Sequence, residues 1–170
     1  MYQHVDTVPT DENWKNHSQG SYMMKLGKLA GVMVGIAALS ACDDGKVENV
    51  FSAQYSASSS SLDVAAGSKF AVPITVKNTS SGTWDSKASK APVLASYHWL
   101  NADKTVLLLD GNRTPFAQPV KPDSEVAVQL GVVAPKAPGN YILQVSLVKE
   151  GAGWFEAKNV KPLELAVKVK

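Results

Sequence analysis

Residues 69–77 read Lys-Phe-Ala-Val-Pro-Ile-Thr-Val-Lys, and this stretch decides the fold because its large apolar side chains recur at every second position. Successive side chains of a β-strand point to opposite faces, so this alternation predicts a strand with one face in a core. Pro73 has no backbone N–H to donate, which favours an edge position or a bulge. The stretch therefore predicts a half-buried strand close to the edge of a sheet.

The period of two recurs along most of the chain that follows. Three further segments alternate in the same way: 126–132, 141–147 and 163–169. Strands are also expected at 93–101 and 105–109, because the Asn and Asp of residues 101–104 favour a tight hairpin turn between them. The serine-rich stretch 54–61 is flanked by apolar residues and is interpreted as part of an irregular first edge strand. No segment after residue 50 has the apolar spacing of a helix, which predicts an all-β domain.

About seven strands between residues 51 and 170 are typical of an immunoglobulin-like antiparallel β-sandwich. Two aromatic residues favour this architecture. Trp99 lies in the third main strand, where such domains often bury a tryptophan, and Tyr141 begins the penultimate strand, as a tyrosine corner requires. The Tyr141 hydroxyl is then expected to donate to the backbone just upstream. A small open barrel or a jelly roll is the alternative architecture.

The only cysteine of the chain, Cys42, follows an apolar run. Lys25 and Lys28 precede this run, and residues 29–41 are 13 residues without a charge, whereas a membrane span needs roughly 20. Basic residues, then an apolar run, then small residues form the order of a secretion signal. The segment is therefore interpreted as a cleaved signal rather than a membrane-spanning helix.

Leu39-Ser40-Ala41-Cys42 resembles the lipobox of bacterial lipoproteins. The resemblance implies cleavage between Ala41 and Cys42, a diacylglycerol on the Cys42 sulfur, and an acyl chain such as palmitate on the new amino terminus. Two or more acyl chains hold a protein on a bilayer. Asp43 resembles the signal that retains lipoproteins in the inner membrane of enteric bacteria, although other Gram-negative groups read this position differently. The expected location is therefore a membrane, with the domain facing the periplasm or the cell surface.

These features divide the chain into four segments. The first 22 residues are polar and mixed in charge, which suits a signal poorly, whereas Met23 or Met24 begins a good one. The expected segments are a mis-assigned or non-native extension (1–22), a lipoprotein signal peptide (23–41), the lipidated Cys42 with a tether (42–50), and the β-sandwich domain (51–170).

Composition argues against several classes of function. Seventeen Lys and Arg residues are interspersed with 15 Asp and Glu residues and form no basic block, so we expect no nucleic-acid partner. His98 is the only histidine after the signal, so we expect no metal and no cofactor apart from the covalent lipid on Cys42. Asp110 and Glu150 are candidates for a glycosidase pair, but both more naturally end strands. We therefore expect no enzymatic activity.

Four motifs in the second half resemble, in order, a family of bacterial immunoglobulin-like modules appended to glycosyltransferases and methyltransferases of surface-polysaccharide clusters. The motifs are Ser96-Tyr-His-Trp-Leu100, Asp110-Gly-Asn-Arg-Thr-Pro115, Pro138-Gly-Asn-Tyr-Ile-Leu143 and Leu147-Val-Lys-Glu-Gly-Ala-Gly-Trp-Phe155. The resemblance covers residues 68–170. It implies a fold and a cell-envelope context, and it implies no activity.

In a sandwich of this order, three loops meet at one end: 78–92, 110–115 and 150–159. They carry the candidate binding residues Trp84, Arg113, Trp154 and Phe155, whose aromatic and basic side chains are enriched in binding surfaces. The alternative interpretation is structural: Arg113 pairs with Asp110 or Glu150, while Trp154 and Phe155 fold back as a lid over the core. His98 is expected to face away from Tyr97 and Trp99, exposed or partly covered.

Together these observations predict a membrane-anchored, non-catalytic binding or scaffolding module of the bacterial cell envelope. Its expected partners are the membrane, through the lipid anchor, and an envelope protein. The alternative is a carbohydrate-binding module that recognises a surface polysaccharide or peptidoglycan, because an aromatic platform stacks on sugar faces.

Overall fold

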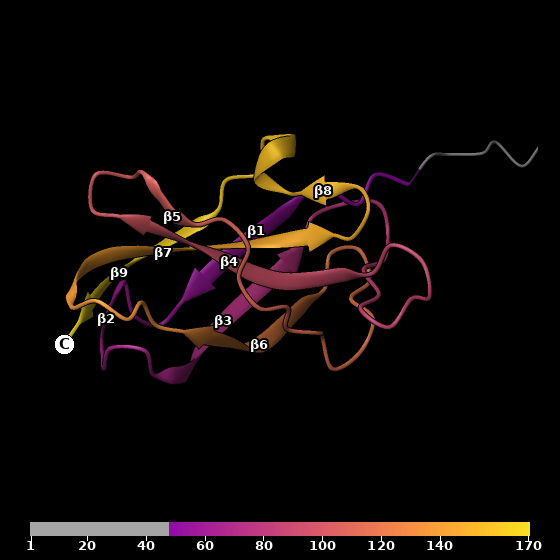
Figure 1. The fold of residues 1–170 in the computed structure, drawn as a ribbon. Helices are drawn as coiled ribbons and strands as arrows, with labels where there is room; N and C mark the ends of the chain where they lie inside the picture. Colours follow the sequence, from indigo (N-terminus) through magenta and orange to yellow (C-terminus); the bar gives the residue numbers. More distant parts are fainter. Residues whose placement is uncertain (1–47) are drawn as a thin grey trace, which may run out of the picture. The chain divides into compact units, whose positions relative to one another are not determined.

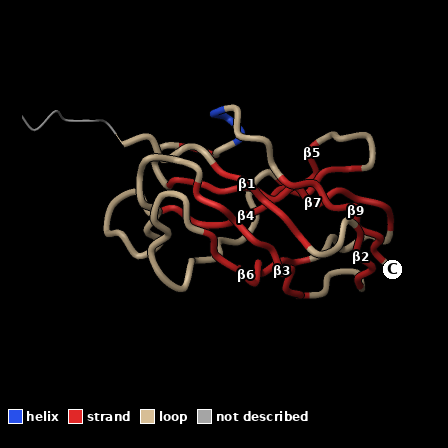
Figure 2. The backbone as a smooth tube through the Cα atoms, turned by 180° about the vertical axis from the view of Figure 1, so that it is seen from behind, coloured by secondary structure: helices blue, strands red, loops and turns tan. Residues whose placement is uncertain are grey.

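The computed structural model describes residues 48–170. In chain order the elements are β1 (Ala53–Ala57), β2 (Ser61–Val64), β3 (Lys69–Asn78), β4 (Val93–Asn101), β5 (Val106–Leu108), β6 (Glu125–Val133), β7 (Gly139–Lys149), β8 (Gly153–Trp154), the 3₁₀ helix η1 (Glu156–Lys158) and β9 (Leu163–Val169). Figure 2 shows this short helix beside the strands and the connecting loops. The predicted all-β class is confirmed.

The strands form two packed sheets (Figure 1). One sheet has the order β1-β3-β6, and the other has the order β2-β9-β7-β4-β5, with β8 paired to β7. The pairs are antiparallel except for β2 and β9, which run parallel. Within the described range, β5 and β6 are therefore edge strands of the two different sheets.

The strands expected from alternation are all present, and the expected hairpin turn joins β4 to β5, where the Lys104 amide donates to the Asn101 carbonyl. Pro73 lies in β3, between β1 and β6. The pairing of β1 ends at Ile74, however, so Pro73 has a paired residue only on the β6 side, at Gln129. The predicted edge position is therefore wrong for the strand, since β3 is the central strand of its sheet; Pro73 is tolerated because β1 does not extend to it.

The expected irregular first strand consists of two strands that belong to different sheets. Tyr55 of β1 pairs with Val76 of β3, whereas Leu62 of β2 pairs with Val167 of β9. The serine-rich turn between them carries the chain from one sheet to the other. The first segment of the domain therefore contributes one strand to each sheet.

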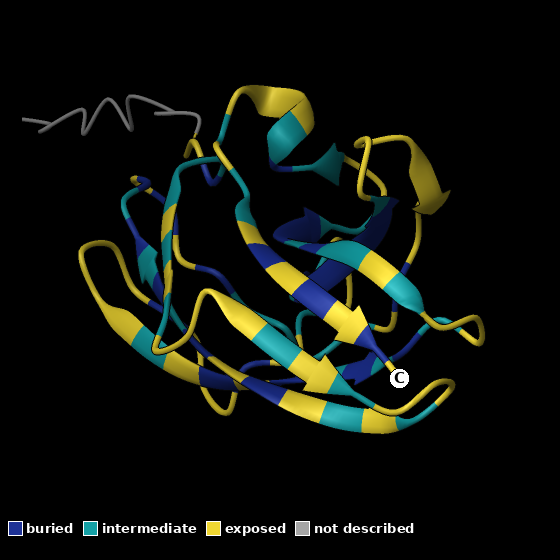
Figure 3. Cartoon of the chain, turned by 90° about the vertical axis from the view of Figure 1, so that its left-hand side faces the viewer, coloured by how far each residue is buried: buried dark blue, intermediate teal, exposed yellow. Residues whose placement is uncertain are grey.

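The core lies between the sheets and follows the predicted alternation. Figure 3 shows buried and exposed residues alternating along β9 up to the C-terminus. Tyr97 and Trp99 point inward and are almost fully buried. The Tyr141 hydroxyl donates to the Ala137 carbonyl at 3.1 Å, as the sequence predicted for a residue at the start of this strand.

The packed region begins before residue 51, the predicted start of the domain. The amides of Ser81 and Gly82 donate to the Asn49 carbonyl, and the Trp84 indole donates to the Val50 carbonyl at 2.9 Å. The extension 1–22, the signal peptide and Cys42 lie outside the described residues. Within residues 48–170, no helix has the length and hydropathy needed to cross a membrane.

Candidate functional site

The outer face of β4 and β7 carries polar side chains that are nevertheless buried. Tyr97 and Trp99 point into the core, so their strand neighbours Ser96 and His98 point outward, and Ser146 does the same on β7. These three residues are at most 2% exposed. The chain after β7 covers His98 and Ser146, because it turns back as β8 and continues into η1 (Figure 1), while Ser96 contacts Gly111 and Arg113.

His98 is enclosed by acceptors and an aromatic ring. Its Nδ1 faces the Leu109 carbonyl, its Nε2 lies 2.7 Å from Oε1 of Glu156, and its ring centroid is 4.0 Å from that of Trp154. A carbonyl and a carboxylate both accept hydrogen bonds, so each ring nitrogen of His98 faces an acceptor within the domain. Both ring nitrogens are therefore occupied.

Glu156 is the centre of the buried polar group. Its second carboxylate oxygen accepts a hydrogen bond from the Ser146 hydroxyl. Burial raises the pKa of Glu156, but the hydrogen bonds from His98 and Ser146 favour the charged form more strongly and hold the pKa below its ordinary value. We call Ser96, His98, Ser146 and Glu156 the closed cluster, since each of their side chains has a partner within the domain.

Arg113 lies at the rim of the closed cluster with its side chain 27% exposed. Its Nε donates to Glu150 at 2.6 Å, and its Nη1 donates to Asp110 at 2.5 Å, to the Gly111 carbonyl at 2.8 Å and to Ser96 at 3.1 Å. The guanidinium carbon is also 5.0 Å from the Trp154 ring, within the range of a cation–π contact. Asp110 and Glu150 thus converge on Arg113.

Gly111 allows the segment after β5 to lie against β4. Its amide donates to the Tyr97 carbonyl at 2.9 Å, and a Cβ at this position would lie only 2.6 Å from the same carbonyl oxygen. Glycine is therefore required for the close approach that brings Asp110 and Arg113 to the outer face of the sheet.

The structure brings together two of the four predicted surface residues and removes the other two. Arg113 and Trp154 are in contact and partly exposed. Trp84 and Phe155 are 0% exposed, with ring centroids 5.7 Å apart, so both belong to the core and neither contributes to a surface. β8 ends at Trp154, and the backbone is already helical at Phe155, which begins the turn into η1 and places its ring in the core. The lid interpretation therefore holds for Phe155.

The expectation for His98 also needs correction. It faces away from Tyr97 and Trp99, as expected, but it is 2% exposed rather than exposed or partly covered. The covering residues, Trp154 and Glu156, come from a segment more than 50 residues away in the sequence.

Sequence reasoning missed Ser96, Ser146 and Glu156. The signal for the two serines is a small polar residue at the outward position of a largely apolar strand, since Ser96 and Ser146 lie directly opposite each other in the β4–β7 register. Glu156 has a weaker signal, because an acidic residue after two aromatic residues is equally typical of a solvated loop. Within residues 48–170, no group of three or more metal-ligating side chains is present.

Comparisons with known proteins give little further information. No protein-family model and no curated protein matches the chain. Among solved structures, the chain is similar to a family 123 glycoside hydrolase from Clostridium perfringens, studied for glycolipid glycan hydrolysis. The TM-score is 0.37 and the identity 10%, over 69% of this chain and 27% of the hydrolase. The chain therefore spans about a quarter of the length of that hydrolase.

Proposed function

We propose that this protein is a membrane-anchored lipoprotein whose domain is a non-catalytic binding or scaffolding module of the bacterial cell envelope. We further propose an immunoglobulin-like topology for its sandwich. The sheet order β1-β3-β6 is compatible with strands A, B and E of that fold, and the order β9-β7-β4-β5 with strands G, F, C and C′. Buried Trp99 and the hydrogen bond of Tyr141 support the same proposal.

The observation that carries the non-catalytic part of the proposal is the closed state of His98. A nucleophile needs a base within hydrogen-bond reach that is free to take its proton. Both nitrogens of His98 are engaged with Leu109 and Glu156, and the Ser146 hydroxyl donates to the same carboxylate. These groups satisfy one another, which favours a structural role over acid–base chemistry.

The anchoring part of the proposal rests on the sequence. The Leu39–Cys42 lipobox implies a lipid on Cys42, and Asp43 favours retention in the inner membrane with the domain in the periplasm. The proposed binding surface is the exposed rim of the closed cluster, formed by Arg113, Trp154, Asp110 and Glu150. Arginine and tryptophan are enriched in binding hot spots, and their mutual contacts here hold both side chains in place.

Fractionation and affinity capture with the full chain test this proposal. Wild type should be recovered in the membrane fraction, and Cys42→Ser should leave it, because removal of the acylated sulfur removes the anchor. Capture from detergent-solubilised membranes with wild type, but not with the double variant Arg113→Ala/Trp154→Ala, should recover an envelope protein. Lys168→Ala, an exposed substitution on β9, is the matched control and should behave as wild type.

Membrane recovery of Cys42→Ser, or equal capture by wild type and the double variant, would contradict the proposal. Melting curves of each variant show whether a loss of capture reflects unfolding. The alternative is carbohydrate binding. It is supported by Trp154 and by Asp110 and Glu150, all of which contact Arg113, since aromatic rings and acidic groups both contact sugars. Capture of a surface glycan or of peptidoglycan, without a protein, would favour that alternative.

A further inference from the structure

The most unusual surface of the domain is a run of four apolar residues at β5. Val106, Leu107, Leu108 and Leu109 are 57%, 48%, 41% and 62% exposed, and they are the exposed large apolar residues of the described chain. Scattered exposed apolar residues need no explanation, but a contiguous run is costly to keep in water and marks an interaction site. The run is therefore a candidate binding site for another molecule.

This run lies on a free sheet edge. Within residues 48–170, the sheet order ends at β5, so the outer edge of β5 has no paired strand. Edge strands are commonly short or bulged, and β5 is itself three residues long with a register shift in its pairing to β4. Exposed edge strands also commonly carry lysine or proline, which prevent pairing with another chain. β5 carries neither and instead presents valine and leucine at successive positions.

A groove lies beside this edge, with a volume of about 390 Å³. Its lining is apolar apart from one lysine and consists of Trp99, Leu107, Leu108, Val133, Ala134, Pro135, Lys136, Ala137 and Tyr141. Trp99 and Tyr141 are held in place, because each donates a hydrogen bond to a backbone carbonyl, at Val133 and Ala137 respectively. We call this groove together with the free edge of β5 the β5 groove.

The edge of the other sheet on this side, β6, is closed by side chains. The Gly131 amide donates to Thr114, the Val133 amide donates to the Tyr97 hydroxyl, and the Val133 carbonyl accepts from the Trp99 indole. These bonds use backbone groups that an added strand would need. β6 is therefore closed to pairing along this stretch, while β5 is open.

We propose that the β5 groove binds an extended, apolar segment of a partner protein, which adds a strand to the free edge of β5. Strand addition combines backbone hydrogen bonds with side-chain pockets, and β5 offers the edge while the groove offers the pocket. Lys136 is the one charged residue of the lining, so the segment carries an acidic residue opposite it. The site uses none of the side chains of the Arg113–Trp154 rim, and only the argument against a bilayer as occupant rests on the proposed lipid anchor.

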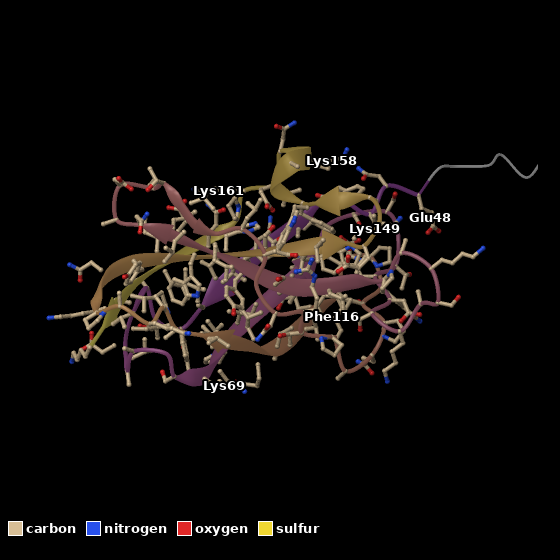
Figure 4. All side chains as sticks on the ribbon, viewed as in Figure 1. Glu48, Lys69, Phe116, Lys149, Lys158 and Lys161 are labelled. Carbon is tan, nitrogen blue, oxygen red and sulfur yellow. The ribbon has the colours of Figure 1, made fainter. Side chains whose placement is uncertain are left out.

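Two other occupants fit the observations less well. A symmetric dimer joined through this patch would bury about a few hundred Å² of accessible surface on each copy. The total is below the roughly 1,200 Å² that a stable interface buries. A bilayer is disfavoured by position, because Figure 4 shows Glu48, where the described chain begins, at the end of the domain away from β5, which Figure 1 places at the opposite end. A separate protein segment is the remaining occupant.

Methyl NMR of the full chain in lipid nanodiscs tests the site directly, because leucine and valine methyl groups line it. The probe is a short synthetic peptide of alternating valine and threonine with an aspartate at one end. Its addition should shift the methyl signals of Val106, Leu107, Leu108 and Leu109. Leu107→Lys should weaken binding by about tenfold or more, because it places an ammonium group in an apolar site.

The matched control is Gln54→Lys, which adds the same charge to an exposed position of β1, an edge strand of the other sheet. It should leave peptide binding unchanged. Peptide shifts outside the β5 groove, or equal binding by Leu107→Lys and wild type, would overturn the proposal. So would methyl shifts that depend on protein concentration, which indicate self-association, or shifts caused by the nanodisc lipid without peptide. Since neither variant alters Cys42, Arg113 or Trp154, failure here is distinguishable from failure of the proposed function.

Discussion

The closed cluster and the β5 groove adjoin neighbouring residues of the same strand, β4: His98 points to the outer face and belongs to the cluster, whereas Trp99 points inward and lines the groove. Their chemistry is opposite. In the closed cluster, polar side chains are buried and each has a partner, as His98 does with Leu109 and Glu156. In the β5 groove, apolar side chains are exposed beside an unpaired sheet edge. The comparison teaches that the chemically richest residues of this domain are used internally, while its apolar residues remain available for a partner.

The difference arises from what covers each site. Near the start of β4, the segment after β7 returns as β8 and η1, and Phe155 fixes it by inserting into the core. Near the end of β4, the hairpin to β5 leaves the sheet edge uncovered within the described range. Coverage by one short segment therefore separates a structural cluster from a binding groove.

The largest effect on stability is expected from truncating Phe155, the side chain that fixes the β8–η1 segment to the core. Phe155→Ala should lower the free energy of unfolding by about 3–5 kcal/mol, because it leaves a cavity beside Trp84 and Phe51. Leu109→Ala, at the exposed end of the comparison, should change it by no more than about 0.5 kcal/mol. Urea unfolding of both variants measures the contrast. Similar losses for the two variants would show that the apolar run belongs to the core.

An intermediate effect is expected from Glu156→Gln, which neutralises the centre of the closed cluster. Loss of charged hydrogen bonds to His98 and Ser146 should cost about 1–3 kcal/mol at neutral pH. Because the pKa of Glu156 is lowered by folding, its contribution is present above the ordinary value of 4.5 and is lost as pH falls through the lowered value.

The measurement for this second prediction is urea unfolding at about pH 7 and at about pH 3. Wild type should lose more stability than Glu156→Gln between these two values. Glu164→Gln is a suitable control, since Glu164 forms an exposed pair with Lys104 that should contribute less than about 1 kcal/mol. An identical pH response of wild type and Glu156→Gln would contradict a stabilising role for the charged Glu156 carboxylate in the closed cluster.

The smallest effect is expected from Tyr97→Phe, which tests the difference between the two sheet edges. This change removes the acceptor of the Val133 amide and should cost about 0.5–1.5 kcal/mol. Hydrogen exchange at Val133 should become faster, while exchange in β3, in the interior of the same sheet, should change no more than the global stability requires. Unchanged protection at Val133 would show that the hydroxyl does not close the edge of β6.

Much of the fold could be predicted from alternation. The strands at β3, β6, β7 and β9 follow directly from their period of two, because one face of each is buried. The division of the first strand between two sheets could not be predicted, since it depends on which distant strands, β3 and β9, offer a free edge.

The candidate site was less predictable. Trp84 and Phe155 are aromatic residues in loops, and composition cannot separate a loop residue that binds a partner from one that completes the core. Alternation gives no signal at Trp154 and Phe155, because the strand ends between them and the chain turns into η1. The apolar run of β5 has the same pattern as a fully buried strand, so its exposure depended on the sheet order.

The parallel pairing of β2 and β9 gives the domain a mechanical property. β2 belongs to the first segment of the domain and β9 to the last, so a pull on the two ends of the chain drags these strands in opposite directions along their shared ladder. In such shear, the slanted hydrogen bonds of a parallel pair share the load rather than opening one after another. A domain held at one end and pulled by a partner at the other is thereby built to resist extension.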